Sequence, residues 1–265
     1  MNRKYFAASL SLAAAALYGC SWIHPPAEPF IPVQSFVAPE PGAHAPLVVV
    51  LPGAGDSLAG LRDSGIVDAV QKGMPRADVL LVGATLPYYK EGRFAERLHA
   101  EVIQAARDRG YREIYLAGAS LGGMGAVLYD RHYPGELTGL VLLAPFMGDD
   151  KVLKEVQDAG GVRAWDAGAE PDTINSDNYP HELWRAVKGW GEHRERARSV
   201  WLACGADDRL LPVAKTIARE LPKGHFLQPA GGHLWVVWNP AATELFQRIA
   251  RGAKPATDDA DDASD

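Results

Sequence analysis

Short apolar runs alternate with longer stretches of helical periodicity along most of this chain. Runs that match strands cover residues 33–37, 47–51, 79–82, 114–117, 139–143, 200–204 and 226–228. Helical patterns lie between them, and the clearest cover residues 94–109, 121–133 and 213–221. Continuous apolar runs are typical of parallel strands that are buried on both faces of a sheet. The alternation therefore predicts an α/β fold with a mostly parallel sheet flanked by helices.

One interval breaks this alternation. Between the strands at 139–143 and 200–204 lie about 50 residues, far more than an ordinary connection needs. Three tryptophans fall within helix-like patterns of this interval: Trp165, Trp184 and Trp190. Because the interval leaves the sheet at its carboxyl edge, where the chemistry of such folds gathers, we expect residues of about 148–198 to form a helical lid. The alternative is a helical excursion whose tryptophans make a small core of their own.

The first 19 residues predict an export signal that is not part of the fold. Arg3 and Lys4 give a basic start, and residues 5–18 form an apolar stretch too short to span a bilayer. The stretch closes on Gly19 and Cys20, which resembles the signal of a bacterial lipoprotein. That resemblance implies cleavage before Cys20 and attachment there of a diacylglyceryl group and often a further acyl chain, enough for durable anchoring. An ordinary signal peptide cut nearby is the alternative.

The residue after this cysteine bears on location. Ser21, instead of an aspartate, resembles lipoproteins that are sorted to the outer membrane of a double-membraned bacterium. The expected location is therefore the bacterial cell envelope, with a lipid anchor in the outer membrane and the protein facing the periplasm. A periplasmic or secreted protein is the alternative if Cys20 carries no lipid.

Both ends of the mature chain differ in composition from its middle. Residues 20–46 hold seven prolines and are expected to form a stiff tether. Residues 254–265 hold five aspartates against one lysine, which predicts a disordered acidic tail. The remaining stretch, 47–253, suits a single α/β domain.

Charge and cysteine content narrow the function. The formal net charge of −6 gives no basic footprint for nucleic acid. Cys204 lies in a strand pattern and is expected to be a small core residue, neither a nucleophile nor a ligand. No spacing of histidine, cysteine and aspartate predicts a metal site, and we expect no cofactor.

Residues 118–122 (GASLG) stand between an apolar run and a helical pattern. Glycines on both flanks permit a strained and closely packed turn from strand to helix, with Ser120 lifted to the carboxyl edge of the sheet. This placement predicts a nucleophile elbow. The alternative is a glycine-rich turn in which Ser120 only caps the helix.

A serine hydroxyl needs a base to become a nucleophile, and the base needs an acid to orient it. Asp208 directly follows the strand at 200–204, and His233 lies on the loop after the strand at 226–228. These three motifs resemble the α/β-hydrolase family over essentially the whole of 47–253. The resemblance implies an α/β-hydrolase fold with a helical lid insertion. It also implies Ser120 as nucleophile, His233 as general base and acid, and Asp208 as the orienting carboxylate.

Two choices among similar residues follow from position. His233 is the one of eight histidines that lies on a loop at the expected carboxyl edge. Asp207 is adjacent to Asp208, but family sequences place the acid three residues after a glycine and four before a proline. Gly205 and Pro212 give that spacing for Asp208, and Asp207 is then a solvated or loop-bracing carboxylate.

Acyl transfer also needs backbone donors already aimed at the oxyanion. The amide of Leu121, directly after the nucleophile, is one candidate. The other should come from the loop 52–56 (PGAGD), where we choose Ala54. Family members usually carry histidine and glycine at the start of this loop, whereas here Pro52 replaces the histidine and Gly53 stays.

The resemblance implies a serine hydrolase that cleaves carboxylic esters through an acyl-enzyme. The expected partners are a small-molecule or lipid-like ester and the membrane, contacted through the lipid on Cys20. A serine at the elbow argues against the dehalogenases and epoxide hydrolases of the family, which use an aspartate there. Lipase, thioesterase or peptidase activity on the same fold stays open, as does a non-catalytic envelope protein that reuses the fold for binding.

Overall fold

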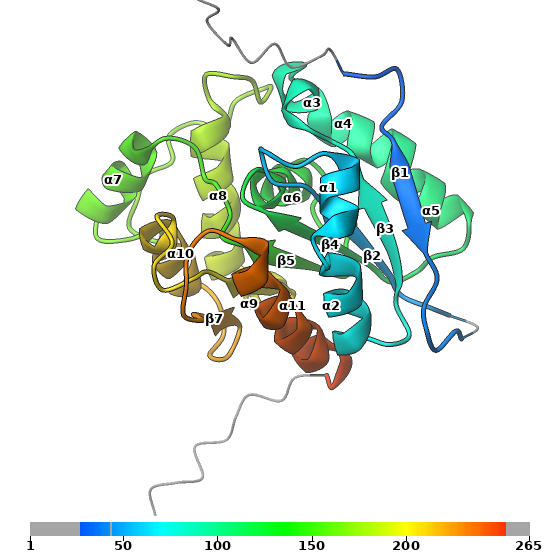
Figure 1. The fold of residues 1–265 in the computed structure, drawn as a ribbon. Coiled ribbons are helices and arrows are strands. Elements are labelled where there is room, and N and C mark those ends of the chain that lie inside the picture. Colours follow the sequence, from blue (N-terminus) through cyan, green and yellow to red (C-terminus); the bar gives the residue numbers. More distant parts are fainter. Residues whose placement is uncertain (1–26, 43, 253–265) are drawn as a thin grey trace, which may run out of the picture.

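The computed structural model describes residues 27–42 and 44–252 (Figure 1). The predicted signal peptide, the proposed lipidation site Cys20 and the acidic tail at 254–265 lie outside the described residues. In the described part, no helix has both the length and the apolar character that crossing a membrane requires.

A seven-stranded sheet forms the centre of the domain, in the order β1-β3-β2-β4-β5-β6-β7. The strands are β1 (Val33–Phe36), β2 (Leu47–Leu51), β3 (Asp78–Val82), β4 (Ile114–Ala119), β5 (Gly139–Leu143), β6 (Val200–Ala203) and β7 (Phe226–Leu227). All neighbouring pairs are parallel except β1 with β3, which is antiparallel. Every residue of β2 and β5 is buried, as expected for apolar strands covered on both faces. The predicted α/β fold with a mostly parallel sheet is confirmed.

Helices cover both faces of this sheet. They are α1 (Leu58–Asp63), α2 (Ile66–Gly73), α3 (Leu86–Lys90), α4 (Phe94–Leu98), the π-helical segment η1 (His99–Ile103), α5 (Gln104–Asp108), α6 (Leu121–His132), α7 (Asp150–Asp158), α8 (Tyr179–Glu192), α9 (Arg194–Ala197), α10 (Leu211–Ala218) and α11 (Trp235–Ala250). Helices α2 and α11 pack on each other over one face, and α6 packs with α4 and α8 on the other (Figure 1).

Two helices differ in detail from the sequence pattern. The helix predicted over 94–109 is present, but η1 interrupts it at His99, whose Nδ1 lies 2.9 Å from the Tyr129 hydroxyl of α6. Helix α10 begins at Leu211, ahead of its predicted start, because Pro212 fits the first turn of a helix, where no intrahelical N–H bond is lost.

Strand register brings together the loops that follow β4, β5, β6 and β7. The final residues of four neighbouring strands are partners across the sheet: Ala119, Leu143, Ala203 and Leu227. The chain therefore leaves β4, β5, β6 and β7 along one edge of the sheet, the carboxyl edge, where ligands of such folds bind.

The insertion between β5 and β6 contains α7, α8 and α9. Trp165, Trp184 and Trp190 are each at most 3% exposed and belong to the core that continues into the sheet. Trp190 Nε1 donates to Asp130 Oδ2 of α6 at 2.9 Å, and Arg196 reaches the other oxygen of the same carboxylate at 2.6 Å. Trp190 therefore holds the insertion to α6, and the three tryptophans form neither an isolated core nor an exposed surface.

Candidate active site

Ser120 stands in a strained turn between β4 and α6. Its backbone angles are φ 52° and ψ −110°, a conformation that is costly for a residue with a side chain. Hydrogen bonds hold this residue on both sides: its amide donates to the Leu143 carbonyl at 2.9 Å, and its carbonyl accepts from Phe146 at 3.0 Å. Strain that the surroundings enforce in this way is typical of a functional position, and it presents the serine at the carboxyl edge.

The flanking glycines are required by close backbone contacts. A Cβ on Gly122 would lie 2.5 Å from the Leu51 carbonyl oxygen of β2, and one on Gly118 would collide with the Gly122 carbonyl. Helix α6 can therefore start directly over the strand ends only because neither position carries a side chain.

Asp208 and His233 come from two different strand ends and meet at this edge. Asp208 Oδ2 lies 2.8 Å from His233 Nδ1, and the carboxylate side chain is fully buried. Its other oxygen, Oδ1, accepts the Leu210 amide at 2.9 Å, which fixes the carboxylate plane. Because a carboxylate can only accept here, Nδ1 carries the hydrogen in the neutral ring, and Nε2 is left free to accept a proton.

Backbone contacts join the two loops that carry these side chains. Ala206 donates to the Pro229 carbonyl at 2.7 Å, and Asp207 donates to the Gly231 carbonyl at 2.9 Å. The loops cross so closely that a Cβ on Gly205 would collide with the Gly231 backbone. The distance between Asp208 and His233 is thus set by the main chain and not by flexible side chains alone.

Trp238 completes the support of the imidazole. Its ring meets the His233 ring edge to face, with centroids 4.7 Å apart and planes at 88°. Trp238 is itself buried, and Trp235 packs on it in the same manner at 5.2 Å. The ring of His233 is therefore held by a carboxylate at one position and by an aromatic wall at another.

The competing residues occupy different environments. Asp207 is exposed and bonds through its backbone. His225 lies before β7, at the opposite edge, where it stacks on Trp201 at 3.7 Å, and burial lowers the pKa of its imidazole. His99 contacts Tyr129, and His181 pairs with Glu155 at 3.3 Å within the insertion.

The two predicted oxyanion donors lie at the same edge. Leu121 is the first residue of α6, whose opening amides have no partner inside the helix and carry the positive end of its dipole. In the loop after β2, the Gly53 amide already donates to Asp56 Oδ2 at 3.0 Å, and the Asp56 amide donates to the Gly53 carbonyl at 3.2 Å. Gly53 is thus occupied, whereas Ala54 lies exposed at the tip of this closed turn.

Cys204 sits one residue past β6 and takes no part in this arrangement. It is a free and fully buried cysteine, as predicted. Burial, with a smaller contribution from the Asp208 charge, raises the pKa of its thiol to about 12. A thiol of this kind is not a nucleophile at neutral pH.

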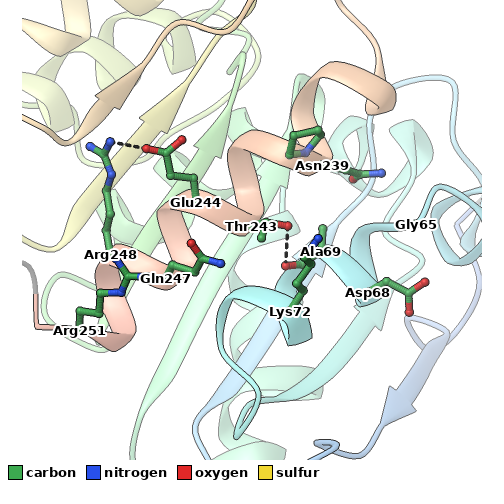
Figure 2. A pocket seen from close by; sticks show the side chains of 11 residues that line it. Gly65, Asp68, Ala69, Lys72, Asn239, Thr243, Glu244, Gln247, Arg248 and Arg251 are labelled. Carbon is green, nitrogen blue, oxygen red and sulfur yellow. Dashed lines mark hydrogen bonds and ion pairs between the residues drawn. The ribbon is translucent and has the colours of Figure 1, made fainter.

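Two further features bear on whether the described residues hold another site. Among the described residues, no cluster of three histidine, cysteine or acidic side chains is placed to hold a metal ion. A groove of about 750 Å³ lies between α2 and α11, and neither Ser120 nor His233 lines it (Figure 2). Thr243 Oγ1 donates to the Ala69 carbonyl at 3.0 Å, and Arg248 pairs with Glu244.

Sequence reasoning missed three residues that build this edge. Asp56 ends the glycine-containing loop 52–56, and Trp235 and Trp238 follow His233 at helical spacing. The sequence does contain a signal for these residues, because a polar residue at the end of a loop and two aromatic residues one turn apart are typical of a packed helix start. Nothing in the sequence indicates, however, that Asp56 contacts Trp235.

Comparisons with known proteins agree with the architecture. No protein-family model matches the chain, and no curated protein matches it. Among solved structures, MPT51 (FbpC1) of Mycobacterium tuberculosis has a TM-score of 0.60 at 15% identity, covering 84% of this chain and 94% of that one. The S-formylglutathione hydrolase FrmB of Staphylococcus aureus has a TM-score of 0.56 at 13% identity, covering 78% and 82%.

A third structure, Est1E of Butyrivibrio proteoclasticus bound to ferulic acid, has a TM-score of 0.54 at 15% identity and covers 84% of this chain and 96% of that one. Identities this low establish a shared fold and nothing finer. With the mostly parallel seven-stranded sheet, the helices on both faces and the strained serine turn after β4, these likenesses show that the chain has the α/β-hydrolase fold.

Proposed function

We propose that the protein is a serine hydrolase that cleaves carboxylic esters, with Ser120 as nucleophile, His233 as base and acid, and Asp208 as the group that orients His233. The observation that carries this proposal is the 2.8 Å contact between a fully buried carboxylate and an imidazole at the sheet edge that also bears the strained serine. The neighbours' names, which include esterases, hydrolases and a monoacylglycerol lipase, agree with this class of reaction.

The reaction proceeds in two steps. Nε2 of His233 takes the proton of the Ser120 hydroxyl while Oγ attacks the ester carbonyl carbon, and the amides of Ala54 and Leu121 stabilise the oxyanion. The ester C–O bond then breaks, and His233 returns the proton to the departing alcohol. Water attacks the acyl-enzyme with His233 again as base, which releases the carboxylic acid and restores Ser120.

Asp208 acts throughout by holding the ring. It fixes the tautomer in which Nε2 faces the reaction and stabilises the imidazolium that forms when His233 is protonated. We expect the hydrogen bond between Ser120 and His233 to form in the complex with substrate, because catalytic hydrogen bonds are often long or poorly aligned in a free enzyme.

Location and substrate form part of the same proposal. We infer from the sequence that the mature protein carries lipid on Cys20 and acts in the bacterial envelope, at the outer membrane facing the periplasm. A small-molecule or lipid-like ester suits that location.

A fluorophosphonate probe tests the assignment directly. The folded wild-type protein should be labelled at Ser120 and should hydrolyse p-nitrophenyl esters. Ser120→Ala should abolish both, while Ser57→Ala, which removes an exposed serine that caps α1, should abolish neither. A folded protein that is never labelled and shows no esterase activity would instead indicate a binding protein.

A further inference from the structure

The carboxylate of Asp56 joins two loops that are far apart in sequence. Its Oδ2 accepts the Gly53 amide at 3.0 Å, within the turn that follows β2. The same oxygen accepts Trp235 Nε1 at 3.0 Å, across 179 residues of sequence, at the first residue of α11. One oxygen therefore links the turn that carries Ala54 to the helix start that follows His233.

The link continues to the imidazole through aromatic packing. Trp235 meets Trp238 edge to face at 5.2 Å, and Trp238 meets His233 in the same way at 4.7 Å. A displacement of Trp235 therefore has a direct route to the ring of His233, while a displacement of Asp56 changes the turn that presents Ala54.

We propose that Asp56 is a positioning residue that keeps the oxyanion turn and the His233 ring in one fixed relation. This inference rests on the proposed function. It identifies a side chain that supports this loop, which lacks the histidine that family members usually carry. Pro52 has no side-chain donor or acceptor, so Asp56 supports the turn from its other end. Asp56 touches the loop and Trp235, and its effect on the reaction passes through Ala54 and His233.

The same helix offers a matched comparison. Along α11, Trp235, Asn239 and Thr243 lie four residues apart, and each donates a side-chain hydrogen bond to the segment 56–69. Thr243 Oγ1 reaches the Ala69 carbonyl at 3.0 Å in the groove shown in Figure 2, away from the catalytic edge. If these bonds only attach α11 to its neighbours, loss of the Trp235 bond should have the same effect on the protein as loss of the Thr243 bond.

Four variants separate the two possibilities. Asp56→Ala and Trp235→Phe each remove the link, and Trp235→Phe keeps an aromatic ring on Trp238. Asp56→Asn keeps one acceptor oxygen and serves as the conservative rescue. Thr243→Val removes a bond of the same type at the other end of the helix.

We expect Asp56→Ala to lower kcat and the rate of fluorophosphonate labelling by about 10- to 100-fold, with KM changed by less than about 3-fold, because the lost support acts in the transition state. Asp56→Asn should recover most of this loss. The double variant Asp56→Ala/Trp235→Phe should be no slower than Asp56→Ala, since both changes break one link. Thr243→Val should lower Tm and leave kcat unchanged.

Three outcomes would overturn the inference: a kcat for Asp56→Ala within about 2-fold of wild type, a loss that Thr243→Val reproduces, or full additivity in the double variant. Failure of the proposed function gives a different result, namely no labelling of the wild type. In that case the link is measured by NMR, through slow solvent exchange of the Trp235 indole N–H that becomes fast in Asp56→Ala. If Asp56→Ala does not fold, Trp235→Phe carries the same test.

Discussion

Asp208 and His233, 25 residues apart in the chain, meet at 2.8 Å because their loops follow β6 and β7, which are neighbours in the sheet. Asp207, next in sequence, faces solvent from the same loop. The two aspartates thus form a natural pair for testing the orienting role.

Asp208→Asn should lower kcat by about 10⁴-fold, because an amide at this position no longer fixes the imidazole tautomer or stabilises the imidazolium. Asp207→Asn should change kcat by less than about 3-fold, since an exposed carboxylate is replaced by an amide of the same shape. Steady-state ester hydrolysis on folded variants of equal Tm makes the comparison. A greater loss for Asp207→Asn would reverse the assignment, and a trivial loss for both would place the acid on another strand.

Gly122→Ala should destabilise the elbow by about 2 kcal/mol or more, because its Cβ would lie 2.5 Å from the Leu51 carbonyl oxygen and the backbone would have to shift. Gly55→Ala is the control, since nothing lies within 4 Å of a Cβ at that position. Chemical denaturation measures both. Equal stability of the two variants would show that α6 can move away from β2 at no cost.

Trp190→Phe should lower stability by about 1–3 kcal/mol, because it removes a buried hydrogen bond to Asp130. The ratio of kcat/KM for short and long esters should stay unchanged, since this tryptophan faces α6. Phe146→Ala should change that ratio, because it removes a half-buried side chain at the start of the insertion, on the residue whose amide bonds the Ser120 carbonyl at 3.0 Å. An altered ratio in Trp190→Phe with none in Phe146→Ala would contradict this prediction and indicate that Trp190 influences acyl preference.

Stability should fall as pH rises from about 9 to about 12, in part because of Cys204. The unfolded thiol loses its proton near pH 9, whereas burial keeps the folded thiol neutral up to about 12, so the unfolded state gains by ionising first. This contribution is at most about 1.4 kcal/mol per pH unit. Cys204→Ala should show a shallower decline of the free energy of unfolding over this range, and an identical decline would mean that the thiol does not take part.

Cys20→Ala should release the protein from the membrane fraction or block its maturation, if the lipid is attached there. Cys204→Ala serves as the matched cysteine control and should partition like the wild type. Normal processing and unaltered partitioning of Cys20→Ala would rule out the lipid anchor.

Much of the fold was visible in the sequence because parallel strands are buried on both faces and appear as unbroken apolar runs. For that reason β2 and β5 match their predicted ranges, and Ser120, Asp208 and His233 could be placed at strand ends. The sequence of a helix does not show in this way which neighbouring element will cover it. The pattern around Trp190 predicted a helix, but not that α6 would bury it.

Contacts between residues far apart in the chain could not be predicted from the sequence either. The bond from Trp235 to Asp56 depends on where α11 crosses the sheet, which follows from the packing of α11 on α2. The contact of His99 with Tyr129 was hidden for the same reason, because it joins residues of two separate helices, 30 positions apart in the chain.

Strand β1 runs against the other six strands, so the chain enters the domain at the edge where those strands end. Pro32, just before β1, accepts a backbone hydrogen bond from Gly83, just after β3, at 2.7 Å. If the residues upstream form the proposed tether, that tether would join the domain at the same edge of the sheet that carries Ser120. An ester embedded in the surface that holds the tether would meet the nucleophile directly, whereas an ester on the far side would have to diffuse around the whole domain.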